Sequence, residues 1–139
     1  MSSKISLSEL ENLSDRPSGL RWVHPEEVDF NSATSETAPN ELLTDQWSKY
    51  LSHRMPGAVD VPVGEIVRDV VELTERFGSS YTIYNLDTYI GYLVGRSPDR
   101  AAILERLNGA LARAPEKLKQ AWSDLITDCN DSSLQRLWR

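Results

Sequence analysis

Apolar residues recur at helical spacing most clearly between residues 63 and 77. At about 100° per residue, the apolar side chains of this segment fill one side of a helical wheel. Its charged side chains fill the other side, which predicts an amphipathic helix. Gly78 follows at the position where a left-handed C-cap commonly ends a helix. The valines of the segment favour strands, but the helical period outweighs that propensity.

Three further helices are predicted from similar patterns and from the residues that precede them. Asn40 is a good N-cap for the first of these helices. Ser97 and Pro98 give the second an N-cap and a proline at its first helical position. Pro115 starts the third, whose apolar face continues to the residue before Asn130. The three predicted ranges are 40–54, 98–114 and 115–129.

The first 40 residues are predicted to be partly irregular. Ser6 and Glu9 have the spacing of a capping box, which opens a short helix over residues 6–13. Pro25, followed by two glutamates, resembles the start of another helix. Residues 31–39 show no apolar periodicity and are predicted to form a mobile linker.

The segment over residues 79–85 has the alternation of a strand, and it is the only plausible strand that the pattern offers. A lone short strand cannot form a sheet, so this segment contributes little to the predicted fold. A helix is predicted to follow it from Asn85 to Gly95, with Tyr92 on the side opposite the apolar stripe.

These elements together predict a mostly α fold. We expect a small helical bundle of about five helices with short connections and at most one or two short strands. The length of 139 residues suits a single domain that spans residues 1–139. Within it, residues 1–39 would form an N-terminal segment with a short helix and a linker, and residues 40–139 the helical core.

Composition shows that the chain is acidic, and the charge is unevenly distributed. The net charge of −6 divides into −4 over residues 1–40, −3 over residues 41–78 and +1 over residues 79–139. Binding to nucleic acid needs clustered lysines and arginines, so no nucleic-acid partner is expected. Apolar runs are only a few residues long, and the N-terminus lacks the apolar core of a secretory signal. We therefore expect a cytoplasmic protein with no membrane partner.

The sequence contains no motif that indicates catalysis, a cofactor or a metal. Glycine-rich phosphate loops, the G-x-S-x-G elbow and the H-E-x-x-H motif are all absent from it. The single cysteine, Cys129, falls at an inward helical position and is predicted to be a buried thiol. Asp124, Asp128 and Asp131 cluster at the end of the last helix, but they lack the EF-hand pattern and are interpreted as a solvated acidic face. We predict no catalytic, cofactor-binding or metal-binding residues.

Aromatic and acidic residues supply the candidate interaction surface. Tryptophan and tyrosine are enriched at the centres of protein interfaces, and four of the five tyrosines lie between residues 81 and 92. Acidic side chains would steer a basic partner toward this surface. The candidate interface residues are Trp22, Glu26, Glu27, Asp29, Asp45, Asp69, Glu72, Tyr81, Tyr84 and Tyr92.

This profile favours a non-catalytic protein that binds a more basic protein, such as a toxin, a nuclease or another effector. Small acidic inhibitors and immunity-type proteins neutralise such partners by covering their surface, and they share this size, charge and lack of catalytic motifs. Two alternatives stay open. One is a self-associating helical module, structural or regulatory, which would form a homodimer through an apolar arc such as that of residues 63–77. The other is a small hydrolase or metal enzyme that uses scattered carboxylates.

Overall fold

The computed structural model describes residues 4–14, 20–32, 37–57 and 59–131. Over these residues it contains six α-helices, one 3-10 helix and one short two-stranded sheet, which confirms the predicted mostly α fold. The chain divides into two compact units, Met1–Asp60 and Val61–Arg139, and each is described by itself. The linker predicted over residues 31–39 falls partly outside the described residues, so its mobility stays a prediction.

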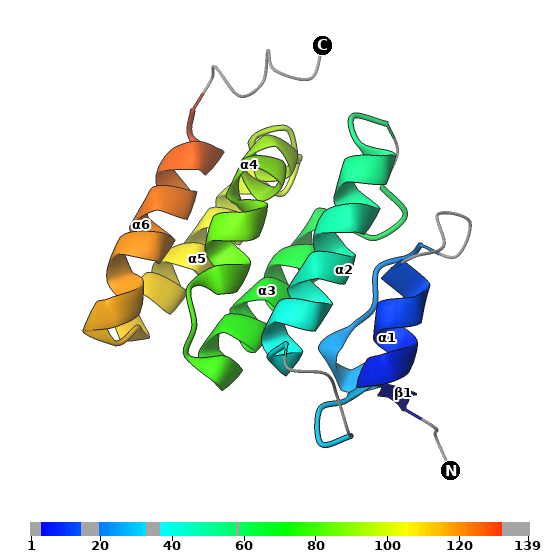
Figure 1. Ribbon diagram of the computed structural model, residues 1–139. Coiled ribbons are helices and arrows are strands. Elements are labelled where there is room, and N and C mark those ends of the chain that lie inside the picture. The colour runs from blue at the N-terminus through cyan, green and yellow to red at the C-terminus, as the bar shows by residue number, and fades with distance from the viewer. Residues whose placement is uncertain (1–3, 15–19, 33–36, 58, 132–139) are drawn as a thin grey trace. The chain divides into compact units, whose positions relative to one another are not determined.

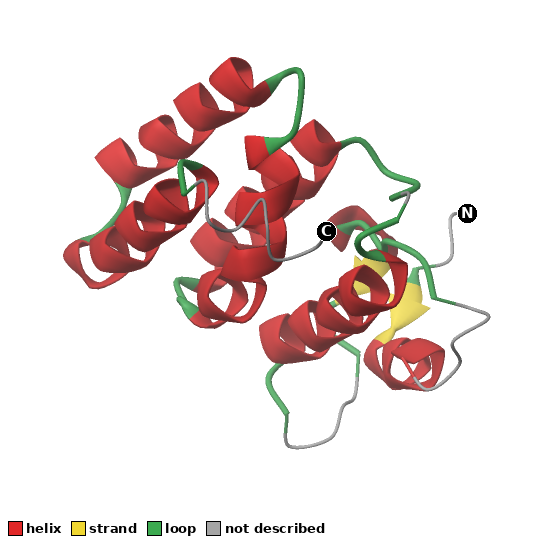
Figure 2. Cartoon of the chain, turned by 90° about the horizontal axis from the view of Figure 1, so that it is seen from above, coloured by secondary structure: helices red, strands yellow, loops and turns green. Residues whose placement is uncertain are grey.

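The first unit combines a small parallel sheet with two α-helices. The elements run in the order β1 (Ile5–Ser6), α1 (Leu7–Ser14), η2 (Pro25–Glu27), β2 (Val28–Asp29) and α2 (Pro39–Arg54). The strands pair in parallel, with Ile5 opposite Val28 and Ser6 opposite Asp29, and Figure 2 shows them side by side in yellow. The N–H of Glu9 donates to the Ser6 hydroxyl over 3.2 Å, so Ser6 caps α1 as the capping-box spacing predicts.

Helix α2 begins earlier than its predicted N-cap. Pro39 is its first residue and Ala38 is the N-cap, so the assignment of the cap to Asn40 was wrong. The fixed φ of a proline suits the first helical position, and its missing N–H is one that a helix start leaves unpaired in any case. Asn40 is instead buried within the first turn, where its carbonyl oxygen accepts the Thr44 hydroxyl over 2.7 Å.

Four helices form the second unit. They are α3 (Val63–Phe77), α4 (Tyr81–Gly95), α5 (Arg100–Arg113) and α6 (Glu116–Cys129), joined by connections of two to four residues. Helix α4 packs against α3, α5 and α6, and α6 also packs against α5 (Figure 1). Apolar side chains from all four helices fill the core between them. The fully buried ones include Ile66, Leu73, Ile83, Leu86, Leu107, Trp122 and Leu125.

The predicted strand over residues 79–85 is absent, because α4 already begins at Tyr81. Ile83, Leu86 and Ile90 are buried at spacings of three and four residues, which is the period of a helix. Helix α4 packs against three other helices, and the burial of these side chains outweighs the strand preference of the aromatic and β-branched residues. Helix α5 likewise starts later than predicted, at Arg100, after a turn that contains Pro98.

Helix α3 and its C-cap agree with the sequence pattern. The helix ends at Phe77, and Gly78 adopts the left-handed conformation with φ of 60°. Its N–H donates to the Thr74 carbonyl oxygen over 2.8 Å, which satisfies one of the carbonyls that a helix end leaves unpaired.

Two glycines of this segment make a matched test of that C-cap. Replacing Gly78 with alanine is expected to lower the free energy of unfolding by about 1 kcal/mol, because an L-residue is strained at positive φ. Gly64 lies in the first turn of α3, where an added Cβ meets nothing within 4 Å. The Gly64→Ala variant is expected to be as stable as the parent or more stable. Urea denaturation of both variants checks this, and equal stability of the two would contradict the assigned cap.

Candidate functional site

The ten candidate interface residues are divided between the two units. Trp22, Glu26, Glu27, Asp29 and Asp45 belong to the first unit, and Asp69, Glu72, Tyr81, Tyr84 and Tyr92 belong to the second. The candidate site therefore has to be sought within one unit at a time.

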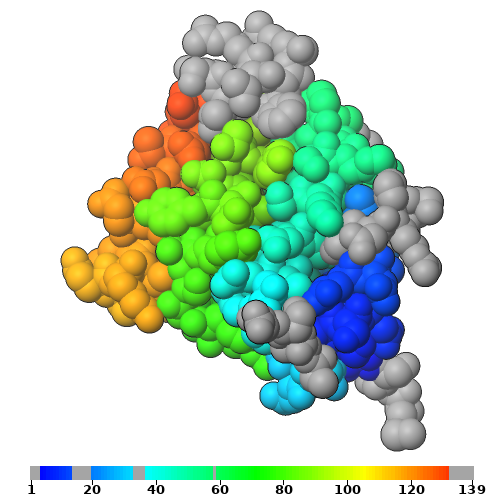
Figure 3. Space-filling view, viewed as in Figure 1, coloured from blue at the N-terminus to red at the C-terminus, as the bar shows by residue number. Residues whose placement is uncertain are grey.

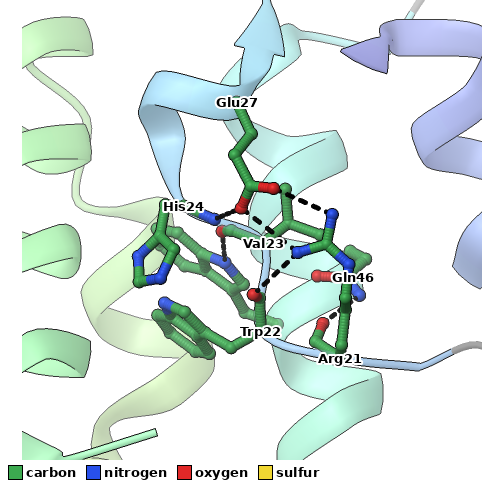
Figure 4. Close-up of polar contacts among 7 residues, drawn as sticks. Arg21, Trp22, Val23, His24, Glu27 and Gln46 are labelled. Atoms are coloured by element: carbon green, nitrogen blue, oxygen red, sulfur yellow. Dashed lines mark hydrogen bonds and ion pairs between the residues drawn. The ribbon is translucent and has the colours of Figure 1, made fainter. Parts of the chain in front are cut away.

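Trp22, a predicted interface residue, lies in the core of the first unit. Its side chain is 3% exposed and stacks on Trp47 with ring centroids 4.4 Å apart. The Trp47 Nε1–H donates to the Val23 carbonyl over 2.7 Å, and the Gln46 side chain donates to the Arg21 carbonyl over 2.7 Å (Figure 4). These two hydrogen bonds and the ring stack attach the extended segment of residues 21–23 to α2.

Glu27 is engaged by neighbouring groups rather than presented to a partner. Arg21 donates to both of its carboxylate oxygens, over 2.9 and 3.2 Å, and the backbone N–H of His24 donates over 2.8 Å (Figure 4). Partial burial alone would raise the pKa of Glu27, but these donors outweigh it and lower that pKa below its usual value. The carboxylate therefore holds η2 and the segment before it together.

The other acidic candidates of the first unit differ in exposure. Asp29 is half-buried and accepts the backbone N–H of Asn31 over 3.0 Å, which closes a turn. Asp45 is half-buried on α2, whereas Glu26 is exposed. Of the four acidic candidates in this unit, Glu26 alone is thus exposed.

Asp69 and Tyr92, two further predicted interface residues, are buried in the second unit. Asp69 is 2% exposed, and its carboxylate accepts from Arg68 over 3.3 Å. Tyr92 is 5% exposed, and its hydroxyl accepts from Arg96 over 2.6 Å. Tyr92 was placed opposite the apolar stripe of its helix, but α4 has three helical neighbours, so more than one side of it is covered.

Tyr84 is the large apolar side chain that remains exposed among the described residues, with 48% of its surface accessible. Its hydroxyl donates to the Asp124 carboxylate of α6 over a long 3.4 Å. Partial desolvation and the Asp124 charge raise the pKa of that hydroxyl, so it is a neutral donor at physiological pH. Of the remaining candidates, Tyr81 is half-buried and Glu72 is exposed on α3.

Four aspartates accompany Tyr84 where α4 and α6 pack together, and we call this surface the α4–α6 acidic face. Asp87 lies one turn after Tyr84 on α4, and Asp124 and Asp128 lie one turn apart on α6. Asp131 follows just beyond the end of α6, and all four aspartates are half-buried. Figure 3 shows the light green surface of α4 adjoining the orange surface of α6.

The charges of the other three aspartates of this face all act on Asp128. Burial, a side-chain hydrogen bond with Asp87, and the charges of Asp87, Asp131 and Asp124 together raise the pKa of Asp128 to about 6. Gln120 donates to Asp124 over 2.8 Å and holds that neighbouring carboxylate in place. At neutral pH the face therefore carries several negative charges close together.

The other polar groups described in the second unit do not indicate a specific ligand. Cys129 is buried, as predicted, and burial and the Asp128 charge raise its pKa to about 12, so it is a thiol at neutral pH. Among the described residues, no three side chains are placed so that they could hold a metal ion. A hollow of about 410 Å³ at the start of α3 carries both basic and acidic groups, Arg68 and Arg106 beside Glu65 and Asp99.

The sequence pattern drew attention to only part of the α4–α6 acidic face. Asp124, Asp128 and Asp131 were grouped but interpreted as a solvated surface, and Asp87 received no role. The signal that could have found Asp87 is its spacing of three residues from Tyr84. Residues three apart lie on the same face only in a helix. Because residues 79–85 were predicted to form a strand, Tyr84 and Asp87 were not placed on a common face.

Comparison with protein-family models, with curated proteins and with solved structures gave no match for this chain. Within the described residues, none of the helices has the length and apolar character needed to cross a membrane.

The burial of Trp22 predicts a loss of stability when the ring is removed. Trp22→Ala is expected to lower the free energy of unfolding by about 3 kcal/mol, because it leaves a cavity beside Trp47. Glu26→Gln, at an exposed position nearby, is the control and is expected to leave stability unchanged. Chemical denaturation monitored by tryptophan fluorescence measures both, and a Trp22→Ala variant as stable as the parent would contradict the core assignment.

Proposed function

We propose that the protein is a non-catalytic binding protein that attaches to a more basic protein through the α4–α6 acidic face. The observation that carries this proposal is the position of Tyr84, a large exposed aromatic side chain with three aspartates on the same pair of helices and a fourth just beyond the end of α6. Tyrosine is enriched at the centres of interfaces because it buries a large rigid ring and still offers a hydroxyl. An acidic surround selects a basic partner.

The two parts of the face would act at different stages of binding. The aspartates raise the rate of encounter with a basic protein, because opposite charges attract over about 10 Å at ordinary ionic strength. Burial of the Tyr84 ring would then slow dissociation. The exposed hydroxyl, now held only by a long bond to Asp124, is available to a polar group of the partner.

Inhibition follows naturally from such binding. Proteins that act on phosphate-bearing substrates use clustered lysines and arginines to hold them. A protein that covers such a basic surface blocks the substrate without any chemistry of its own. The proposed role is therefore that of a cytoplasmic inhibitor or immunity-type protein that neutralises a basic toxin, nuclease or other effector.

Charge reversal within the face tests the proposal. The full-length chain is used to capture partners from an extract of its source cells, and the affinity of any stoichiometric basic partner is then measured by calorimetry. Asp124→Lys and Tyr84→Ala are each expected to weaken binding about tenfold or more, through lost steering and a lost anchor.

Glu105→Lys is the matched control, because Glu105 is exposed on α5, outside the face, and the charge change is the same. Its affinity is expected to stay close to that of the parent. Equal affinity in Asp124→Lys, Tyr84→Ala and the parent, with all variants folded, would refute binding through this face.

A further inference from the structure

The hollow at the start of α3 is also lined by residues of α5, and it carries charges of both signs beside an apolar wall. We infer that this α3–α5 hollow binds a small zwitterion, an amino acid with an apolar side chain, through Arg106 and Asp99. Its volume of about 410 Å³ falls within the range of small-molecule pockets, about 300–1,000 Å³. Its lining residues lie on α3, on α5 or just before these helices, so the site is separate from the α4–α6 acidic face.

Arg68 lines the hollow, but its charge is already balanced. Its Nε and Nη2 groups both donate to the Asp69 carboxylate over 3.3 Å, and Nη2 lies 3.8 Å from the Glu65 carboxylate. Asp69 is 2% exposed, and a buried carboxylate of this kind needs a cation close by. A ligand would therefore have to compete with two carboxylates for Arg68, and we assign its recognition to the other charged groups.

Arg106 and Asp99 are the charged groups of the hollow that a ligand can engage. Both side chains are exposed, and within the described part of the chain neither takes part in a hydrogen bond or an ion pair. Asp99 is the N-cap of α5, and Arg106 follows seven residues later on the same side, about 10 Å along the helix axis. Helical side chains lean toward the N-terminus, which brings the guanidinium nearer to Asp99. A ligand that carries a carboxylate and an ammonium can bridge the two.

The wall between these two charges is apolar. Ala102 and Ile103 contribute to it from α5, and Val63 contributes from α3. Gly64 leaves its part of the wall bare, because an added Cβ there would meet nothing within 4 Å. An aliphatic side chain on the ligand would cover this wall and leave water. A simple anion would leave the wall uncovered and be repelled by the free carboxylate, and a simple cation would be repelled by the free guanidinium.

An NMR titration of the ¹⁵N-labelled full-length chain with L-leucine tests the proposal. L-leucine is expected to shift the amide signals of residues 62–65 and 99–106 saturably. N-acetyl-L-leucine lacks the ammonium and L-leucinamide lacks the carboxylate. Each is expected to bind about tenfold more weakly than L-leucine, because it loses one charge-assisted hydrogen bond. Glycine, which has no side chain to cover the wall, is also expected to bind more weakly.

Two variants assign the charges of the ligand to the two side chains. Arg106→Gln is expected to bind L-leucine about tenfold more weakly and no better than L-leucinamide, because the group that binds the carboxylate is gone. Asp99→Asn keeps a good N-cap residue, and it is expected to bind L-leucine and N-acetyl-L-leucine equally. Lys119→Gln removes an exposed cation of α6 outside the hollow, so it is the control and is expected to keep the parent affinity.

Three results would overturn the proposal. One is the absence of a saturable shift at residues 62–65 and 99–106 with L-leucine. Another is equal affinity of the parent for L-leucine, N-acetyl-L-leucine and L-leucinamide. The third is an L-leucine affinity that survives both Arg106→Gln and Asp99→Asn. Because no partner protein enters these titrations, such a failure is distinct from a failure of binding through the α4–α6 acidic face.

Discussion

The central packing of α4 is the constraint on which the second unit depends. Three helices, α3, α5 and α6, lie against it, so apolar residues such as Ile83 and Val94 are buried and even Tyr92 is covered. Asp87 is therefore half-buried within reach of the acidic last turn of α6, and Tyr84 is left exposed one turn away. The candidate surface is a direct consequence of this packing.

The fold of the second unit was largely predictable where one side of a helix is apolar and the other is charged. The range of α3 and the cap at Gly78 follow from the wheel and from one glycine, because amphipathicity and capping are local properties. The start of α4 was not predictable in this way. Residues 81–85 are rich in aromatic and β-branched side chains, and their helical state depends on contacts with helices distant in sequence.

The candidate site was predictable only in part, and for the same reason. Tyr84 was identified from its residue type, and the spacing of Asp124 and Asp128 places them on one side of a helix. Their meeting with Asp87 depends on how α4 and α6 pack, which no local pattern states. Trp22 shows the converse, because the short extended segment around it has no period and its burial is set by Trp47 of α2.

Two carboxylates of the chain show how the same group can serve opposite roles. Glu27 lies among donors, from Arg21 and the start of η2, and these favour its charge. Asp128 lies at the end of α6 among other acids, which oppose its charge. At neutral pH the second unit therefore holds an electrostatic repulsion on its α4–α6 face.

That repulsion links the stability of the second unit to binding. A cationic group of a partner that neutralised the face would relieve the repulsion between Asp87 and Asp128. A ligand that binds only the folded state stabilises it, and here part of that stabilisation would come from relief of the repulsion among these carboxylates. Under the proposed function, a basic partner would therefore be bound in part because its charge offsets the repulsion among these carboxylates.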